Sequence, residues 1–290
     1  MNTLLIGTSG YDYKGWKQEI NGFQPFYKSK KNVLGQYCDH FQFVELNSPF
    51  YRVPSINTVK KWKNQTPDGF KFTVKVNRTM THNKKLIDFD ELFPSFFDII
   101  QNLNDKLAGL LIQLPPSFKN TKNKSKIDNL TPLERLIKVT KFTSTNYPNI
   151  KFYVEFRDPT WFCDEVYDRL RNLWSVVFVS CGKLANMNPG FSPSLNHSNA
   201  ITLPGYIYFR NHGTWLTQEY SGGYSDDQLA MMLSLFQRNT IVSFDNTDSF
   251  EGQIECEIPG KMLLSKKVIT DNKLISHAIA DAKKLLSYSN

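Results

Sequence analysis

Eight short segments rich in β-branched and aromatic residues recur along the chain, and they constrain the fold more than any other feature. A stretch long enough for a crossover helix follows each segment, as neighbouring parallel strands require. The predicted strands are Leu4–Thr8, Gln42–Asn47, Lys71–Asn77, Gly109–Leu114, Lys151–Arg157, Ser175–Ser180, Tyr206–His212 and Thr240–Asp245. For a chain of 290 residues, this alternation favours a single TIM-like (β/α)8 barrel over a doubly wound sheet.

The fifth predicted strand shows how the two faces of such a barrel would differ. Side chains alternate between the faces of a strand, so Phe152, Val154 and Phe156 form one apolar face. Glu155 and Arg157 fall on the other face, near the carboxyl end of the strand. In a (β/α)8 barrel the apolar face packs under helices, and chemistry gathers at the carboxyl ends of the strands.

Helix signals lie between several of the predicted strands. The clearest are two capping boxes, Thr131-Pro132-Leu133-Glu134 and Ser225-Asp226-Asp227-Gln228, with a further N-cap at Ser55 and a closing amphipathic helix over Asn272–Leu286. A segment rich in Asn, Pro, Ser and Gly at about 183–204 is predicted to be a long loop and a candidate lid. We find no domain boundary and predict one domain over residues 1–290, with a variable segment at about 248–270.

Composition narrows the classes of partner. A formal net charge of +8 favours anionic partners. The four cysteines show no Cys-x-x-Cys spacing, which disfavours a zinc ribbon or a redox pair. Neither a secretory signal nor an apolar run long enough for a membrane span is visible, so we expect a cytoplasmic protein without a membrane partner.

The alternation also predicts which polar side chains meet at the carboxyl ends of the strands. On each strand we assigned the polar face to the barrel interior. The residues that would converge there are Glu45, Asn47, Lys75, Gln113, Glu155, Arg157, Arg210 and His212. Buried charges must be paired or bound to a ligand, and their pKa values are expected to be perturbed.

The leading hypothesis is an enzyme that performs general acid/base chemistry on a small phosphorylated or carboxylated substrate. Arg157, Arg210 and Lys75 would hold the anionic group. Glu155 or Glu45 would act as general base, and His212 would act as acid or base near neutral pH.

Two alternatives use the same side chains differently. In a non-catalytic barrel, Glu155 would pair with Arg157 or Arg210 and Glu45 with Lys75, giving a structural ion-pair network. A divalent metal would enlist Glu45, Glu155, His212 and Asp245. One histidine with scattered carboxylates among many cations is a weak metal signal, so no cofactor is predicted.

Aromatic residues in the predicted loops, among them Tyr51 and Trp161, suggest a different class of function. Rings beside basic groups can stack on bases or sugars, which makes a nucleic-acid-binding or processing protein the second functional candidate. The same rings can instead cap an apolar barrel mouth. His82 follows the third strand among basic residues and joins the candidate binding residues through its position.

An ordered set of motifs resembles the YecE-like family, domain of unknown function 72. The motifs are Gly7-Thr8-Ser9-Gly10 with Trp16, Val44-Glu45-x-Asn47-x-x-Phe50-Tyr51, Phe72-x-Val74-Lys75 leading to Arg78 and Thr81-His82, Gln113-Leu114-Pro115-Pro116-Ser117, Glu155-Phe156-Arg157-x-x-x-Trp161, Tyr208-x-Arg210-x-His212-Gly213, Tyr224-Ser225-Asp226 and Phe244-x-Asn246-Thr247. The resemblance implies a TIM-like barrel whose polar mouth is built from these motif residues, Asn246 included. It implies no settled reaction; an endonuclease-like role rests on analogy of fold and pocket.

This chain departs from the family pattern at three places. Ser180-Cys181 stands where an acidic residue is usual, and Asp245 stands where the family more often has Asn. The segment from 249 to 260 replaces a small-residue, Asn-containing stretch and carries three glutamates. The sequence identifies neither a substrate nor an oligomeric state.

Overall fold

The structure is a computed structural model. It describes residues 3–18, 25–180, 200–214, 222–246, 269–270, 273–274 and 276–289. Most of the predicted loop at 183–204 and most of the variable segment at 248–270 lie outside these ranges.

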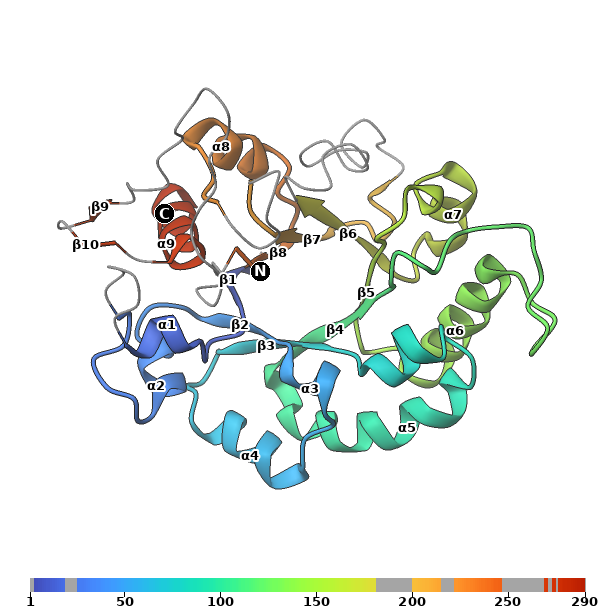
Figure 1. The fold of residues 1–290 in the computed structure, drawn as a ribbon, viewed down its shortest axis with the longest axis horizontal. Coiled ribbons are helices and arrows are strands. Elements are labelled where there is room, and N and C mark those ends of the chain that lie inside the picture. Colours follow the sequence, from blue (N-terminus) through green and yellow to red (C-terminus); the bar gives the residue numbers. More distant parts are fainter. Residues whose placement is uncertain are drawn as a thin grey trace.

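Eight parallel strands close into a barrel in sequence order, with β8 pairing back on β1 (Figure 1). The strands are β1 Thr3–Ser9, β2 Phe43–Leu46, β3 Lys71–Lys75, β4 Leu107–Gln113, β5 Phe152–Glu155, β6 Ser175–Ser180, β7 Tyr206–Asn211 and β8 Asn239–Phe244. Two further short strands, β9 Ile269–Thr270 and β10 Lys273–Leu274, pair with each other. The predicted (β/α)8 barrel is confirmed, and every predicted strand is present within a few residues of its expected ends.

Helices surround the barrel (Figure 1). They are α1 Lys14–Lys17, α2 Val33–Cys38, α3 Ser48–Tyr51, α4 Ile56–Asn64, α5 Phe89–Ile100, α6 Pro132–Asn146, α7 Asp164–Leu170, α8 Asp226–Ser234 and α9 His277–Ser289, with a π-helical turn η1 Thr79–Asn83 and 3₁₀ turns η2 Gln101–Lys106 and η3 Pro159–Trp161. None of the helices in the described ranges is both long and apolar enough to cross a bilayer.

The predicted helix starts are confirmed at three caps. Thr131 and Ser225 each form a reciprocal capping box, and Ser55 accepts a hydrogen bond from the Thr58 backbone N–H. These side chains satisfy backbone donors that the first helical turn leaves without partners. The closing helix α9 begins at His277, later than the expected Asn272, because residues 273 and 274 belong to β10. It packs against β1 and β8.

The two faces of each strand build two different cores. Phe152 and Val154 of β5 point outward into the large apolar layer beneath the helices. Inside the barrel, a smaller apolar cluster fills the lower part: Leu5, Phe43, Leu111, Tyr153, Val177, Val179, Tyr208 and Ile241. The charged residues that follow on these same inward faces therefore lie above an apolar floor, toward the carboxyl ends of the strands.

Gly7 lets β1 and β2 approach each other closely. A Cβ atom at this position would lie 2.1 Å from the backbone oxygen of Phe43 and 2.8 Å from the hydroxyl of Tyr37. That hydroxyl donates to the same Phe43 oxygen at 2.9 Å and accepts from the Thr8 backbone N–H at 2.9 Å. There is no room for a methyl group among these atoms.

We expect Gly7→Ala to lower the free energy of unfolding by about 1–3 kcal/mol, because overpacking against backbone cannot relax cheaply. Chemical denaturation with circular dichroism measures the change. Leu4→Ala on the same strand is the control: Leu4 is 36% exposed, so its truncation should change stability much less. Equal stability of the Gly7 variant and wild type would contradict the close-approach account.

Candidate functional site

The guanidinium of Arg210 occupies the centre of the barrel, where its side chain is 1% exposed. Its Nε and Nη2 donate to the two carboxylate oxygens of Glu45 at 2.8 and 2.7 Å. Its Nη1 pairs with Glu155, and its Nη2 also lies 3.1 Å from Asp245 Oδ2. The planar guanidinium of this β7 residue therefore binds three carboxylates, which lie in β2, in β5 and directly after β8.

Glu45 has donors on both of its oxygens. Besides Arg210, the Ser9 hydroxyl donates to Oε1 and the Tyr208 hydroxyl donates to Oε2. Ser9 and Glu45 are direct partners in the β1–β2 register, which places the hydroxyl beside the carboxylate. Burial, reinforced by the charge of Glu45, holds the pKa of Tyr208 well above its usual value, so the phenol remains a donor.

Glu155 is held in the same manner from two sides. Arg157 Nε pairs with its Oε1, and Arg210 Nη1 pairs with its Oε2. Burial alone would raise the pKa of this carboxyl, but the two guanidiniums hold the pKa well below its usual range. A carboxylate with so low a pKa is a poor acceptor for a substrate proton near neutral pH.

His212 lies between Asp245 and the two arginines. Its Nδ1 is 2.9 Å from Asp245 Oδ2, while its Nε2 is 3.0 Å from Arg157 Nη2 and 3.3 Å from Arg210 Nη1. Guanidinium groups only donate hydrogen bonds, so Nε2 acts as an acceptor and the ring proton faces Asp245. Burial would raise the pKa of Asp245, but the bond to His212 and the charge of Arg210 lower it. The carboxylate thus orients the imidazole.

The structural-network alternative predicted two pairings. The pairing of Glu155 with arginine is confirmed, and the pairing of Glu45 with Lys75 is wrong. Glu155 pairs with both Arg157 and Arg210, but Glu45 does not pair with Lys75. Arg210 reaches Glu45 with two parallel N–H groups, which leaves Lys75 outside that pair. Two buried hydroxyl groups also donate hydrogen bonds to Glu45, so its carboxylate is fully hydrogen-bonded without an ammonium.

Lys75 is the exception among the charged groups at the mouth. Its side chain extends from the end of β3, the residue is 9% exposed, and no ion pair or hydrogen bond joins its Nζ to any described residue. Its contact is with a ring: Nζ lies 4.2 Å from the centre of Phe50 on α3. Asn77 fixes that helix by donating to the backbone oxygens of Pro49 and Phe50 at 2.9 and 3.2 Å.

The surroundings of Lys75 lower its proton affinity. Burial is the main cause and the charge of Arg210 the next, and together they lower the pKa of Lys75 to about 8. Arg157 acts in the same direction, while Glu155 and Glu45 act against it. A fraction of this amine is therefore neutral near physiological pH.

His82 contacts the same ring. Its imidazole meets Phe50 edge to face with centres 4.8 Å apart, and its Nδ1 lies 2.9 Å from the Thr81 hydroxyl. Burial, followed by the charge of Lys75, lowers the pKa of His82 to about 4. His82 and Lys75 therefore contact the same aromatic ring.

The loop that carries His82 has an unusual backbone. It begins with the π-helical turn η1 and continues through Lys85, Leu86 and Asp88 with φ of 49°, 68° and 54°. The left-handed region disfavours non-glycine residues, and both features are frequent at functional sites. The buried Leu86 side chain and a 3.0 Å bond from Arg135 to the Lys85 backbone oxygen hold the conformation.

Three other predicted binding residues lie directly after β2, at the end of β4 and at the end of α3. Asn47 donates to the Ser9 hydroxyl at 2.6 Å, and thereby joins the network around Glu45. Gln113 is paired in register with Glu155 and is 9% exposed. Tyr51 is 69% exposed and makes an edge-to-face contact with Phe50. Its ring stands at the outer rim of the mouth.

Trp161 and Asn246 lie apart from the mouth. Trp161 is fully buried, stacks on Phe156 at 5.0 Å, and donates its indole N–H to the Phe118 backbone oxygen at 2.5 Å. Asn246 is fully buried and donates to Gly222 O and to Asp281 Oδ2 of α9. Trp161 packs in the outer layer and Asn246 ties α9 to the barrel, so contacts with a substrate are not their role in this arrangement.

Ser9 and Tyr208 belong to the family motifs, but the sequence did not predict that their hydroxyl groups bind Glu45. Ser9 and Tyr208 bind Glu45, and Tyr208 also shares a 2.9 Å bond with Thr73. A hydroxyl in a sequence gives no signal of which carboxylate it will bind. Asp245 was considered only as a metal ligand, and it instead binds Arg210 and His212.

The metal alternative involves the same groups. The part of the chain that the structure describes contains no group of three or more His, Cys, Asp or Glu placed to hold a metal ion. Glu45, Glu155 and Asp245 direct their carboxylates at Arg210. The absence of a cofactor stays a prediction.

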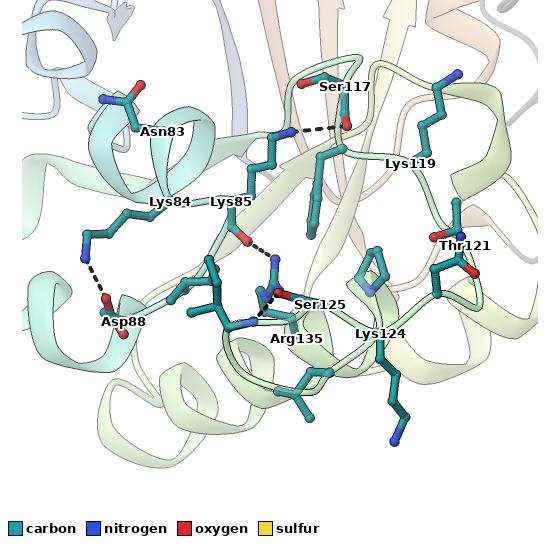
Figure 2. A pocket seen from close by; sticks show the side chains of 16 residues that line it. Asn83, Lys84, Lys85, Asp88, Ser117, Lys119, Thr121, Lys124, Ser125 and Arg135 are labelled. Atoms are coloured by element: carbon teal, nitrogen blue, oxygen red, sulfur yellow. Dashed lines mark hydrogen bonds and ion pairs between the residues drawn. The ribbon is translucent and has the colours of Figure 1, made fainter.

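A separate open groove of about 680 Å³ lies outside the mouth, beside the loop that carries Lys85 (Figure 2). Its basic lining residues are Lys84, Lys85, Lys119, Lys124 and Arg135. Three of these charges are already paired, Lys84 with Asp88 at 2.5 Å, Arg135 with Asp128 at 2.8 Å and Lys119 with Asp158 at 3.9 Å. Figure 2 shows Lys119 and Lys124 extending away from the other labelled side chains. The groove therefore presents little concentrated positive charge.

Comparison with known proteins assigns the chain to a family. The family model described as "Protein of unknown function DUF72" matches residues 5–254. The chain belongs to the DUF72 family. The motif resemblance is thereby confirmed, and so is the barrel expected from it: a DUF72 family protein (EF0366) from Enterococcus faecalis V583 aligns over 100% of this chain and 98% of its own, with a TM-score of 0.65 and 15% identity.

Curated relatives of this DUF72 chain have names without an activity. The UPF0759 protein YunF of Bacillus subtilis (strain 168) is 31% identical over 161 residues, which is 53% of this chain and 52% of YunF. The UPF0759 protein YecE of Escherichia coli (strain K12) is 33% identical over 85 residues, 29% of this chain and 31% of YecE. The chain thus matches about half the length of YunF and less of YecE.

Replacing Glu45 by Gln tests how strongly the central carboxylate holds the DUF72 barrel together. We expect Glu45→Gln to lower the free energy of unfolding by about 3–5 kcal/mol, because it leaves part of the buried Arg210 charge without its counter-charge. Urea denaturation measures the loss. Glu91→Gln, at an exposed glutamate of α5, should change stability little. A Glu45 variant as stable as the Glu91 variant would contradict the account.

Lys75→Met is expected to raise stability at pH 7 by roughly 1–3 kcal/mol, because it removes a buried charge that has no counter-ion among the described residues. Lysine titrates at 10.5 when unperturbed and Lys75 at about 8. Between these values the unfolded chain binds a proton that the folded chain does not, so wild-type stability rises with pH. The advantage of the variant should therefore shrink above pH 8.

Denaturation of both proteins at pH 7 and pH 9 measures this trend. Lys124→Met, at an exposed lysine, should show no comparable pH dependence. A Lys75→Met variant that is destabilised equally at both pH values would show that its ammonium has a counter-charge in solution.

Proposed function

We propose that this DUF72 protein is an enzyme that binds a small phosphorylated or carboxylated substrate at the barrel mouth and moves a proton within it. The observation that carries the proposal is the ammonium of Lys75, which is nine-tenths buried and has no counter-ion among the described residues. Such a group is costly in a purely structural network, and an anionic ligand would supply the missing charge.

The anionic group would lie between Lys75 and Arg157. Arg157 is 8% exposed and pairs with Glu155 through Nε, while its Nη2 faces His212. Arg210 lies deeper and is committed to Glu45, Glu155 and Asp245, so in this proposal it organises the site and does not bind the ligand. Phe50 and His82 would form the wall beside Lys75.

The proton would pass through His212. Asp245 orients its Nδ1 side, and its Nε2 accepts from Arg157. An anion that draws the Arg157 guanidinium toward itself would free Nε2 to take a substrate proton. Glu45 and Glu155, first considered as general bases, become positioning residues in this proposal, because guanidinium and hydroxyl donors occupy their oxygens.

Thermal unfolding in the presence of anions tests the binding part. We expect inorganic phosphate or pyruvate, well above its dissociation constant, to raise the Tm of the wild type by several degrees. Lys75→Gln and Arg157→Gln should lose this increment, whatever their own Tm. The exposed Lys124→Gln should keep it, because that residue lies in the separate groove.

Ligand binding should also weaken as pH rises through about 8, where Lys75 loses its charge. If phosphate, sulfate, citrate and pyruvate all leave the wild-type Tm unchanged, the proposal fails. It fails as well if Lys124→Gln abolishes the effect and Lys75→Gln does not.

Nucleic-acid binding is the second function considered from the sequence. The net charge of +8 is its main support. The groove in Figure 2 adds little, since Asp88 and Asp128 neutralise two of its basic side chains. Binding to DNA and RNA across a salt series would distinguish the two functions, because phosphate-backbone contacts weaken steeply as salt rises.

A further inference from the structure

Two lysines are buried in the described part of the chain, and they differ in the hydrogen bonding of their ammonium groups. Lys106 is 4% exposed, and its Nζ donates to Lys63 O at 2.8 Å, to Thr66 O at 2.6 Å and to Thr66 Oγ1 at 3.1 Å. Its ammonium donates to backbone oxygens at the carboxyl end of α4, a place where lysine commonly binds free carbonyls. Lys75 is nearly as buried, yet none of the residues that the structure describes offers its Nζ an acceptor of this kind.

The position of Lys75 suits a group that reacts. It lies at the carboxyl end of β3, the end where barrel enzymes carry their chemistry. Arg210 and Arg157 add positive charge, and no carboxylate of the described residues forms an ion pair with Lys75. The loop after β3 has positive φ angles on both sides of Ile87. His82, from the same loop, packs against Phe50. Desolvation beside other cations is how proteins make a lysine amine nucleophilic.

We propose that Lys75 is a nucleophilic amine that forms a Schiff base with an aldehyde or ketone substrate carrying a phosphate or carboxylate. The inference rests on the proposed function, because Arg157 would bind the anionic group and so bring the carbonyl carbon to Nζ. It goes further by naming the reacting atom and the substrate class.

The covalent step balances without a further reactant. The neutral Nζ attacks the carbonyl carbon, a C–N bond forms, and the carbonyl oxygen takes up a proton. The resulting carbinolamine then loses its oxygen as water, so that an ammonium and a carbonyl give an iminium and one water. The iminium withdraws electrons from the neighbouring carbon, whose proton becomes easier to remove. His212 is the base available at this mouth for that proton.

The state of the amine supports the step. With the pKa of Lys75 at about 8 instead of 10.5, the free-amine fraction at pH 7 is roughly a few hundredfold larger than for an ordinary lysine. The charges that set this balance are Arg210, Arg157, Glu155 and Glu45. An exposed lysine shares none of these neighbours.

Borohydride trapping on the full-length wild type tests the proposal. Dihydroxyacetone phosphate or pyruvate is added at pH 7.5, sodium borohydride reduces any iminium to a stable secondary amine, and peptide mass spectrometry locates the adduct. We expect labelling at Lys75 to exceed that at any other lysine by at least about tenfold, with Lys106 unlabelled in the same digest. Dihydroxyacetone, which lacks the phosphate, should label Lys75 at least about tenfold less.

The outcomes separate this inference from the proposed function. Lys75→Arg keeps a positive charge without a nucleophilic amine, so it should retain a phosphate-induced rise in Tm and form no adduct. A wild type that is stabilised by phosphate but labels Lys75 no faster than its exposed lysines would overturn the Schiff-base proposal and leave anion binding standing. Absence of any stabilisation by anions would instead remove the proposed function itself. Equal labelling by dihydroxyacetone would overturn the assignment to anionic carbonyl compounds.

Discussion

The fork of Arg210 is the interaction on which the interior of this barrel depends. Its three nitrogens bind carboxylates on Glu45, Glu155 and Asp245, each supplied by or directly after a different strand. Removing so many charges from water is expensive, and only near-complete pairing with good geometry offsets the loss. The apolar floor below and the hydroxyls of Ser9 and Tyr208 beside it supply that geometry.

The complete pairing of charges at the centre of the barrel makes the unpaired state of Lys75 among the described residues significant. Arg210 and Arg157 bind Glu45 and Glu155, and within the described ranges no carboxylate pairs with Lys75. The chain could satisfy this ammonium with backbone oxygens, as it does for Lys106. It instead places Lys75 over the face of Phe50 at the end of β3. The two buried lysines therefore differ in their surroundings: oxygen acceptors surround the ammonium of Lys106, and an aromatic ring faces that of Lys75.

Alternation along the strands was sufficient to predict the fold and the inward direction of the charged residues. Glu45, Glu155, Arg157, Arg210 and His212 meet because side-chain direction in a strand has a period of two and barrel strands end at a common rim. The partners within the cluster could not be predicted in this way. Whether Glu45 meets Arg210 or Lys75 depends on their depth along the barrel axis, which register sets and composition does not reveal.

Two residues of the family motifs do not lie where a binding residue would be expected. Trp161 and Asn246 entered the predicted site through the family pattern, yet Trp161 is enclosed by Phe118 and Phe156, and Asn246 reaches α9. Asn246 is adjacent to the inward Asp245 and must therefore point to the opposite face, so the alternation rule already contained that signal. A motif residue can recur for packing or for chemistry, and the motif alone does not say which.

The ring of Phe50, shared by Lys75 and His82, has a consequence for proton traffic at the mouth. The ammonium is one of the causes that keep the imidazole uncharged. An anion that neutralised Lys75 would weaken this repulsion and make His82 more basic, so ligand capture and proton uptake would be linked through one aromatic side chain. By reciprocity, acidification of the medium would tighten the hold on the anion.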